Sequence, residues 1–420
     1  MRRLLPLLTC AALLLAGCSR RERANPFDPL NPATSGRPPG FTAVAGDHSV
    51  RLRWESVQGN SLLGYQLFRR GPTDTVFAPL TEELDLSVST IRDFPLTNGT
   101  DYAYRLYFVF PFGLGSRPAE DVAAPGAAVP WVIEAGGTDL ISVAPDDRRV
   151  ASRFGDYTST SDVAVNPASG AVWIADEGSG SVVVFQPAGS LRRSSPGLRR
   201  PRAVAVDAFD GSGWVCDVEQ GLVFHFGVNG EQASVAIAPL VQPVDAAVDA
   251  EDGSVWICEL GADRVSRHEY TQGFWQERWA ASVQAPSRVA IDGETRDGWV
   301  TSFANGTVTK LSSVTGARLL SLTGFQSPLG VAVDAARGRI WIADPHAGSV
   351  VALDRDGNVE FRVAGLADAG EISVDAGTGE AWAVLGRSGE LVRISPAGVL
   401  LRRLKAFHSP VAVSVDPGGR

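Results

Sequence analysis

The sequence predicts an all-β protein, and two observations support this prediction. First, its 420 residues include 45 glycines and 26 prolines but only 20% charged residues, which is typical of turn-rich globular domains and not of disordered chains. Second, short apolar runs of strand length recur along most of the chain, bounded by Gly, Asp or Asn. The length leaves room for two or three domains.

A tryptophan-centred repeat occupies residues 127–420. Its tryptophans follow one another at intervals of 41 to 43 residues: Trp131, Trp173, Trp214, Trp256, Trp299, Trp341 and Trp382. Seven residues before six of them, an acid or an asparagine closes an apolar run, as Asp334 does before Trp341. A repeat of this period with several strands per copy is typical of propeller blades, so we predict a seven-bladed β-propeller.

The two ends of the repeat array are each incomplete, and their defects complement each other. Asp416 closes an apolar run but no tryptophan follows it, whereas Trp131 has no matching strand before it, since Ala124 stands in the expected place. An open ring would leave unpaired strand edges at the seam. We therefore predict that the C-terminal strand, within His408 to Asp416, closes the propeller by joining the blade of Trp131.

The N-terminus has the pattern of an export signal. Arg2 and Arg3 precede an apolar stretch from Leu4 to Leu15 that is too short to span a membrane as a helix. The following Leu-Ala-Gly-Cys18 resembles the lipobox of bacterial lipoproteins. This resemblance implies a signal peptide over residues 1–17, a lipid anchor on Cys18, and, because Ser19 follows, a place in the cell envelope at the outer membrane. An ordinary secretory leader is the alternative.

Residues 18–126 are expected to form a spacer of two parts. Residues 18–40 are polar and proline-rich, which predicts a semi-rigid tether. Residues 41–126 contain about seven strand-like segments with turn residues between them, as in a small β-sandwich. Trp54, the Gly64-Tyr65 pair, and Leu96 six residues before Tyr102 resemble a fibronectin type III domain. We expect this domain to present the propeller.

The phrase Trp-Ile-Ala-Asp, which ends at Asp176 and Asp344, resembles the NHL and YVTN families of propeller repeats. The resemblance implies a fold and no particular chemistry. We expect the tryptophans to pack between adjacent blades and these acids to accept hydrogen bonds in turns. Cys216 and Cys258 occupy the same register in neighbouring copies, so we expect two buried free thiols and no disulfide.

A candidate ligand site lies where the innermost strands enter the central tunnel. Asp162, Asp245, Arg288 and Glu371 share one register near the start of these strands, two positions after the usual proline. Three carboxylates and an arginine around one axis could bind a hard cation or a sugar hydroxyl. They could equally cap the strand starts. We expect no resident cofactor or metal.

The charges of the chain limit the partners that we expect for it. The net charge of −9 argues against nucleic acid as a partner. The cluster of Arg192, Arg193, Arg199, Arg200 and Arg202 is an anion site or, as we prefer, a solvated loop between blades. We expect an envelope scaffold that binds a protein or carbohydrate ligand.

The alternative is a tunnel-mouth hydrolase or lyase acting on a carbohydrate or lactone. The propeller fold resembles streptogramin lyases, whose histidines converge in the tunnel, and gluconolactonases, which hold a metal through Glu, Asp and Asn. Here His225 and His268 are expected on outer strands, and only His408 approaches the rim. Asn166 and Asn305 are expected in turns. Neither catalytic set is reproduced.

Overall fold

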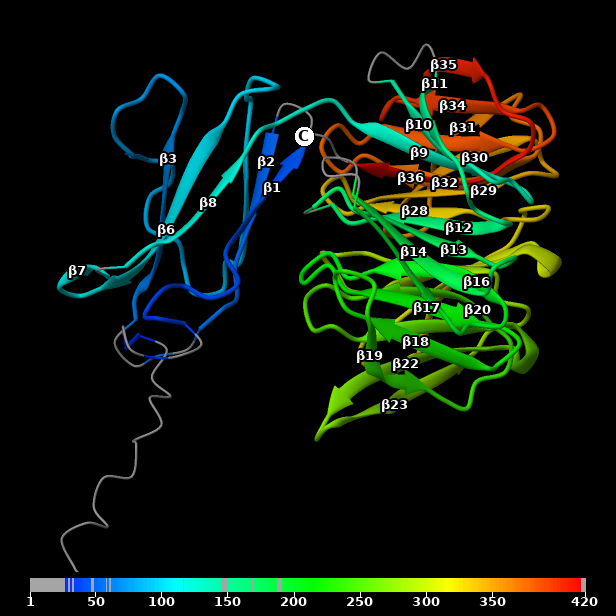
Figure 1. The fold of residues 1–420 in the computed structure, drawn as a ribbon, viewed down its shortest axis with the longest axis horizontal. Helices are drawn as coiled ribbons and strands as arrows, with labels where there is room; N and C mark the ends of the chain where they lie inside the picture. Colours follow the sequence, from blue (N-terminus) through cyan, green and yellow to red (C-terminus); the bar gives the residue numbers. More distant parts are fainter. Residues whose placement is uncertain are drawn as a thin grey trace, which may run out of the picture. The chain divides into compact units, whose positions relative to one another are not determined.

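The computed structural model describes residues 27–28, 31, 34–46, 49–57, 59, 62–115, 117–144, 150–167, 169–186 and 191–416 (Figure 1). The predicted signal peptide and Cys18 lie outside these residues. The described chain forms two compact units: residues before Val44 join Leu52–Ile91 and Asp101–Val122 in one, while Val44–Arg51, Arg92–Thr100 and the chain from Ala123 onward form the other. In the described part, no helix is long and apolar enough to cross a membrane.

Two sheets account for the strands before residue 124. The first contains β1 (Thr42–Gly46), β2 (Ser49–Arg53) and β5 (Thr90–Asp93); the second contains β4 (Ala78–Pro79), β3 (Gly64–Arg70), β6 (Tyr102–Phe110), β7 (Gly113–Leu114) and β8 (Ala119–Ala123). Trp54 and Tyr65, which carry the fibronectin resemblance, are buried, and their ring centroids lie 5.6 Å apart. Tyr65 also contacts Phe108, 5.9 Å away between ring centroids. The described part of this segment contains strands and no helix, whereas the sandwich and the fibronectin resemblance stay predictions.

The remaining described strands form seven four-stranded antiparallel sheets, which we number in chain order. Sheet 1 contains β9 (Val129–Glu134), β10 (Leu140–Val143), β11 (Val150–Phe154) and the C-terminal β36 (Pro410–Asp416). The other six sheets each contain four consecutive strands. Sheet 2 contains β12 (Thr160–Val165), β13 (Val172–Asp176), β14 (Ser181–Gln186) and β15 (Leu191–Pro196), and sheet 3 contains β16 (Pro201–Val206), β17 (Gly213–Asp217), β18 (Leu222–Phe226) and β19 (Gln232–Ile237). Sheet 4 contains β20 (Pro243–Val248), β21 (Val255–Glu259), β22 (Arg264–Thr271) and β23 (Phe274–Ser282), and sheet 5 contains β24 (Arg288–Ile291), β25 (Gly298–Ser302), β26 (Thr307–Leu311) and β27 (Arg318–Leu322). Sheet 6 contains β28 (Val331–Asp334), β29 (Arg339–Asp344), β30 (Ser349–Asp354) and β31 (Val359–Ala364), and sheet 7 contains β32 (Ala369–Val374), β33 (Ala381–Leu385), β34 (Glu390–Ile394) and β35 (Leu400–Lys405). Two short 3-10 turns, Leu260–Ala262 and Phe303–Asn305, follow β21 and β25.

Each repeat tryptophan packs on the next sheet of the series. Trp173 of sheet 2 shares a buried cluster with Val204 and Val215 of sheet 3, and Trp382 of sheet 7 shares one with Val132 and Val413 of sheet 1. All seven indoles are nearly or fully buried. The sheets therefore follow one another around a closed ring, as a propeller-like arrangement requires.

The close approach of the tryptophans explains two glycines. A Cβ atom at Gly213 would overlap the ring of Trp173, and one at Gly298 would overlap the ring of Trp256. Both glycines stand directly before the tryptophan of their own sheet. Only glycine, which has no side chain, leaves room at these positions for the indole of the preceding sheet.

The predicted closure by the C-terminal strand is present. In Figure 1, β36 lies beside β9, and the two strands pair antiparallel with Val413 opposite Val132 and Asp416 opposite Val129. Sheet 1 is therefore assembled from both ends of the repeat array. The pairing satisfies the backbone groups on the free edge of β9.

The repeated acids are structural, as predicted. The acids that close the inner strands bond the turn that follows, as Asp207 accepts a hydrogen bond from Phe209 N at 2.7 Å. The acids that end the tryptophan strands reach further than expected. Asp344, for example, accepts hydrogen bonds from Gln326 N and Ser327 N, both at 2.9 Å, and so orients the segment that enters the inner strand of its own sheet.

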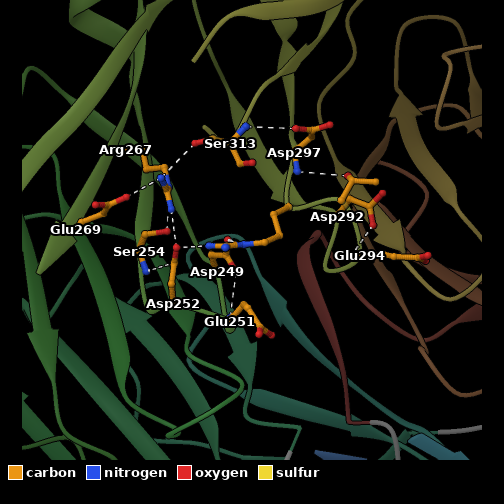
Figure 2. Close-up of polar contacts among 12 residues, drawn as sticks. Asp249, Glu251, Asp252, Ser254, Arg267, Glu269, Asp292, Glu294, Asp297 and Ser313 are labelled. Carbon is orange, nitrogen blue, oxygen red and sulfur yellow. Dashed lines mark hydrogen bonds and ion pairs between the residues drawn. The ribbon is translucent and has the colours of Figure 1, made fainter. Parts of the chain in front are cut away.

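Cationic side chains on the third strands of two sheets bond to the next sheet. Arg267 donates to the carbonyl oxygen of Ser313 in the next sheet at 3.2 Å, and Lys310 donates to the equivalent carbonyl of Arg355 at 3.2 Å. Figure 2 shows Arg267 held between Glu269, Ser254 and Ser313. These bonds between sheets were not anticipated from the sequence.

Both cysteines of the described chain are buried and unbonded, as expected. Cys216 lies on β17 and Cys258 on β21, at the same register of neighbouring sheets. Burial raises the pKa of each thiol well above its ordinary value. The two residues therefore behave as small apolar side chains of the core.

Deleting residues 407–420 should remove β36 and lower the free energy of unfolding by more than about 4 kcal/mol, because it exposes β9 and breaks the ring. Urea denaturation and size-exclusion chromatography would measure the loss and the resulting aggregation. The control is deletion of residues 417–420, which leaves β36 whole. A 407–420 deletion that melts like the parent as a monomer would contradict the closing role of β36.

Candidate functional site

A cavity of about 600 Å³ opens where the inner strands begin. Every one of the seven sheets contributes to its lining. One residue per sheet, directly after the proline or its equivalent, forms a ring around it: Ser161, Arg202, Val244, Ser287, Leu329, Gly370 and Val411. We call this the mouth cavity. Its volume lies within the range of about 300–1,000 Å³ that is usual for small-molecule sites.

β-Bulges place several of these residues in the ring. Pro201 pairs with Asp217 and Ala203 pairs with Cys216, so Arg202 is the extra residue between them. The ladders of β12, β20 and β36 skip the equivalent residues in the same way. A bulge turns the extra side chain out of the regular alternation and is frequent beside functional sites.

The structure divides the four residues that the sequence analysis placed at the tunnel mouth. Of the four predicted residues, Arg288 and Glu371 line the mouth cavity, whereas Asp162 and Asp245 are not in its lining. A comparison of the repeat copies could have pointed to the ring residues. The residue after the proline differs from copy to copy, whereas the structural positions of the repeat stay alike.

The structure nevertheless brings the predicted charges together across the tunnel. Arg288 of sheet 5 forms an ion pair with Glu371 of sheet 7 and lies 3.7 Å from Asp245 of sheet 4, measured from Nη1 to Oδ1. Its Nη1 also donates to Val244 O at 3.4 Å. The side chains of Arg288, Glu371 and Asp245 are only 13%, 14% and 10% exposed. Arg288 is therefore a nearly buried cation with two protein counterions.

Asp162 and Asp245 join neighbouring inner strands. Asp162 Oδ2 accepts a hydrogen bond from Val204 N of the next sheet at 2.9 Å, and Asp245 Oδ2 accepts one from Val289 N at 2.8 Å. Burial raises the pKa of Asp162 to about 6 and that of Asp245 to about 7, with Arg288 opposing the shift in both. The anticipated alternative role, support of the strand starts, describes these two acids.

The buried cluster has little capacity left for an external ligand. Burial acts to lower the pKa of Arg288, but Glu371, Asp245 and Asp162 together raise it above its ordinary value, so the guanidinium stays charged. The carboxylates in turn have Arg288 or backbone donors as partners. Within the described residues, no group of three or more His, Cys, Asp or Glu side chains is placed to hold a metal ion.

The described histidines are not part of the lining of the mouth cavity. His225 stacks on Trp214 with ring centroids 4.3 Å apart, and the ring of buried His268 lies 3.1 Å from Ser266 Oγ. His408 has a 93% exposed side chain 3.6 Å from Glu134. His346 contacts the ring of Phe303 at 5.5 Å. None of these four lines the cavity, and His48 lies outside the described residues.

The wall of the mouth cavity is divided by chemistry. Apolar side chains come mainly from sheets 4 to 6, namely Val244, Leu260, Pro286, Phe303 and Leu329, and sheet 1 adds Ala135, Pro410 and Val411. Most of the polar lining comes from sheets 2, 3 and 7, and includes Ser161, Glu177, Arg202, Asp368 and Glu371. The cavity can therefore receive a ligand with one apolar and one polar side.

Solved structures are similar to the chain in fold. They include a functionally unknown protein from Desulfotomaculum acetoxidans with 12% identity and a TM-score of 0.58, covering 68% of this chain and 98% of that one. A protein from Lactobacillus plantarum has 11% identity and a TM-score of 0.55, with 69% and 99% covered. Virginiamycin B lyase from Staphylococcus aureus has 14% identity and a TM-score of 0.50, with 58% and 83% covered. No protein-family model and no curated protein matches the sequence.

These identities are too low to carry function, but they support the fold. Together with the closed series of sheets, they show that the chain has a β-propeller-like fold. The all-β class predicted from the repeat is confirmed.

Replacing Asp245 with Asn should flatten the pH dependence of stability. Because folding raises the pKa of Asp245 from 3.8 to about 7, the folded state holds a proton that the unfolded chain releases, and the free energy of unfolding falls as pH rises across this interval. Without the carboxyl group, this fall should be smaller by on the order of 1–4 kcal/mol. Urea denaturation at several pH values would measure it.

The matched control is Asp356→Asn, because Asp356 is an exposed acid in the β30–β31 hairpin. This variant should keep the pH slope of the parent. If Asp245→Asn also kept the parent slope, the assigned shift would be wrong.

Proposed function

We propose that this protein is a lipid-anchored binding protein of the cell envelope. In this proposal, a seven-bladed NHL-type propeller offers the mouth cavity to a ligand, and a fibronectin type III-like sandwich and the tether of residues 18–40 hold it away from the membrane. The carrying observation is the cavity itself, to which all seven sheets contribute lining residues. Such a site requires the complete ring.

The state of the charged groups supports binding over catalysis. Arg288 and Glu371 neutralise each other. Asp162 and Asp245, the two acids whose pKa values are raised, accept hydrogen bonds from backbone N–H groups of the next sheet. A general base needs to reach the proton it removes, and these groups are already engaged. The preferred ligand is a carbohydrate or a protein segment of the envelope that inserts one end into the mouth.

A tunnel-mouth hydrolase or lyase is the second candidate. Its support is His346, whose ring contacts Phe303, a lining residue of the cavity. Among the solved structures of similar fold, a histidine variant of virginiamycin B lyase is described as catalytically inactive and was solved with quinupristin. For this chain, turnover of a carbohydrate or a lactone that is lost in His346→Ala would favour the enzyme.

A bulky side chain at Gly370 should close the mouth cavity and abolish ligand binding. A Cβ atom there meets only ordinary contacts, the nearest being Val384 at 3.9 Å, so Gly370→Trp should fold and fill the cavity. Ligand-detected NMR with envelope oligosaccharides and peptides would measure binding. We expect at least one probe to bind the parent and lose its signal with Gly370→Trp.

The control is Gly293→Trp, in the turn at the far end of the inner strand of sheet 5. Its Cβ atom would meet only Ala335, at 3.9 Å. Equal binding to both variants would place the ligand elsewhere, and failure of every probe to bind the parent would count against the proposal.

The lipid anchor is tested by replacing Cys18 with Ser. Acylation of Cys18 should place the parent in the detergent phase after Triton X-114 partition, because several acyl chains hold a protein stably on a membrane. The variant should remain uncleaved or enter the aqueous phase. Unchanged partition of the variant would exclude Cys18 as the lipid site.

A further inference from the structure

The chemistry of the mouth cavity narrows the class of ligand it can take. Five charged residues line it: Glu177, Arg202, Arg288, Asp368 and Glu371. Four of them have protein partners. Glu177 accepts from Arg200 Nε at 2.8 Å, Asp368 lies 3.4 Å from Arg387, and Arg288 pairs with Glu371. Arg202 is the fifth charged residue of the lining.

Arg202 has no acidic or hydrogen-bonding partner among the described residues, and its side chain is exposed. Its sequence neighbours Arg199 and Arg200 are exposed as well, but both have acidic partners. Arg200 pairs with Glu177, and Arg199 lies 4.0 Å from Glu219. Neither Arg199 nor Arg200 lines the cavity. The structure thus separates one arginine from the basic cluster that the sequence presented as a unit.

Arg202 adjoins the apolar side of the cavity. It is the ring residue of sheet 3, and Val244 is the ring residue of sheet 4, whose inner strand packs directly against that of sheet 3. Beyond Val244 the apolar wall continues through Leu260, Phe303 and Leu329. A planar guanidinium with free donors beside an apolar wall suits a ligand that combines an oxyanion with an apolar body.

We propose that the mouth cavity binds an amphipathic anion, whose carboxylate or similar oxyanion pairs with Arg202 and whose apolar body lies against the wall of Val244, Leu260, Phe303 and Leu329. This inference rests on the proposed function and assigns the ligand class of the same site. Arg288 is not the anchor, because Glu371 and Asp245 already neutralise it.

Three probes of equal shape test the charge requirement. Naphthalene-2-carboxylate, naphthalene-2-carboxamide and 2-naphthylmethylammonium would each be titrated into the full chain by calorimetry at neutral pH. We expect the carboxylate to bind with a dissociation constant of roughly 1 mM, which is ordinary for a ligand of about a dozen heavy atoms. The amide should bind roughly ten- to a hundred-fold more weakly, because it lacks the charge-assisted pair.

Arg202→Gln should remove the preference for the carboxylate, whereas the control Arg199→Gln should keep it. Three results would overturn the inference: no binding of the carboxylate up to about 10 mM, equal affinity for carboxylate and amide in the parent, or tighter binding of the ammonium probe. A preference that survives in Arg202→Gln would also overturn it.

The Gly370→Trp variant separates this inference from the proposed function. If Gly370→Trp abolishes binding of envelope probes while the parent shows no charge preference, the mouth is a site and the anion assignment is wrong. If the carboxylate binds Gly370→Trp as well as it binds the parent, the mouth is not its site and both proposals fall.

Discussion

The packing of each repeat tryptophan on the following sheet is the interaction on which the rest of the structure depends. A four-stranded sheet has two faces, and neither is satisfied until a neighbour covers it. Replacing a buried tryptophan by alanine generally costs about 3–5 kcal/mol. Here seven such contacts form a closed series. It runs from Trp131 of sheet 1, which packs against sheet 2, to Trp382 of sheet 7, which packs against sheet 1. Because the series is circular, each interface supports the geometry of the others, and β36 supplies the strand that completes it.

Closure of the ring creates the site. The starts of seven inner strands converge only because the sheets return to their origin. On four of these strands, a bulge also turns the ring residue into the opening. The same convergence forces Asp162, Asp245 and Arg288 out of water. Backbone donors to Asp162 and Asp245, and the ion pair of Arg288 with Glu371, offset part of the cost of burying these charges.

The repeated and the variable residues divide the work. Acids that recur in most copies, such as Asp207 and Asp344, accept backbone hydrogen bonds within their own sheet. The ring around the mouth changes at each step, from Ser161 to Arg202 to Val244. An array of like blades therefore needs variation at one register to build an asymmetric site, with a charged side facing an apolar one.

The sequence alone determined the class of fold, the period, the buried tryptophans and the joining of the two chain ends, because these follow from local alternation and from spacing along the chain. It also grouped Asp245, Arg288 and Glu371, since equivalent strands start at one face. Tertiary structure decided the rest. The bulge at Arg202 depends on how β16 pairs with β17, and the pairing of Arg288 with Glu371 spans 83 residues and depends on the diameter of the closed ring. Neither a bulge nor a distance across the tunnel is encoded in the period of two on which a strand prediction relies.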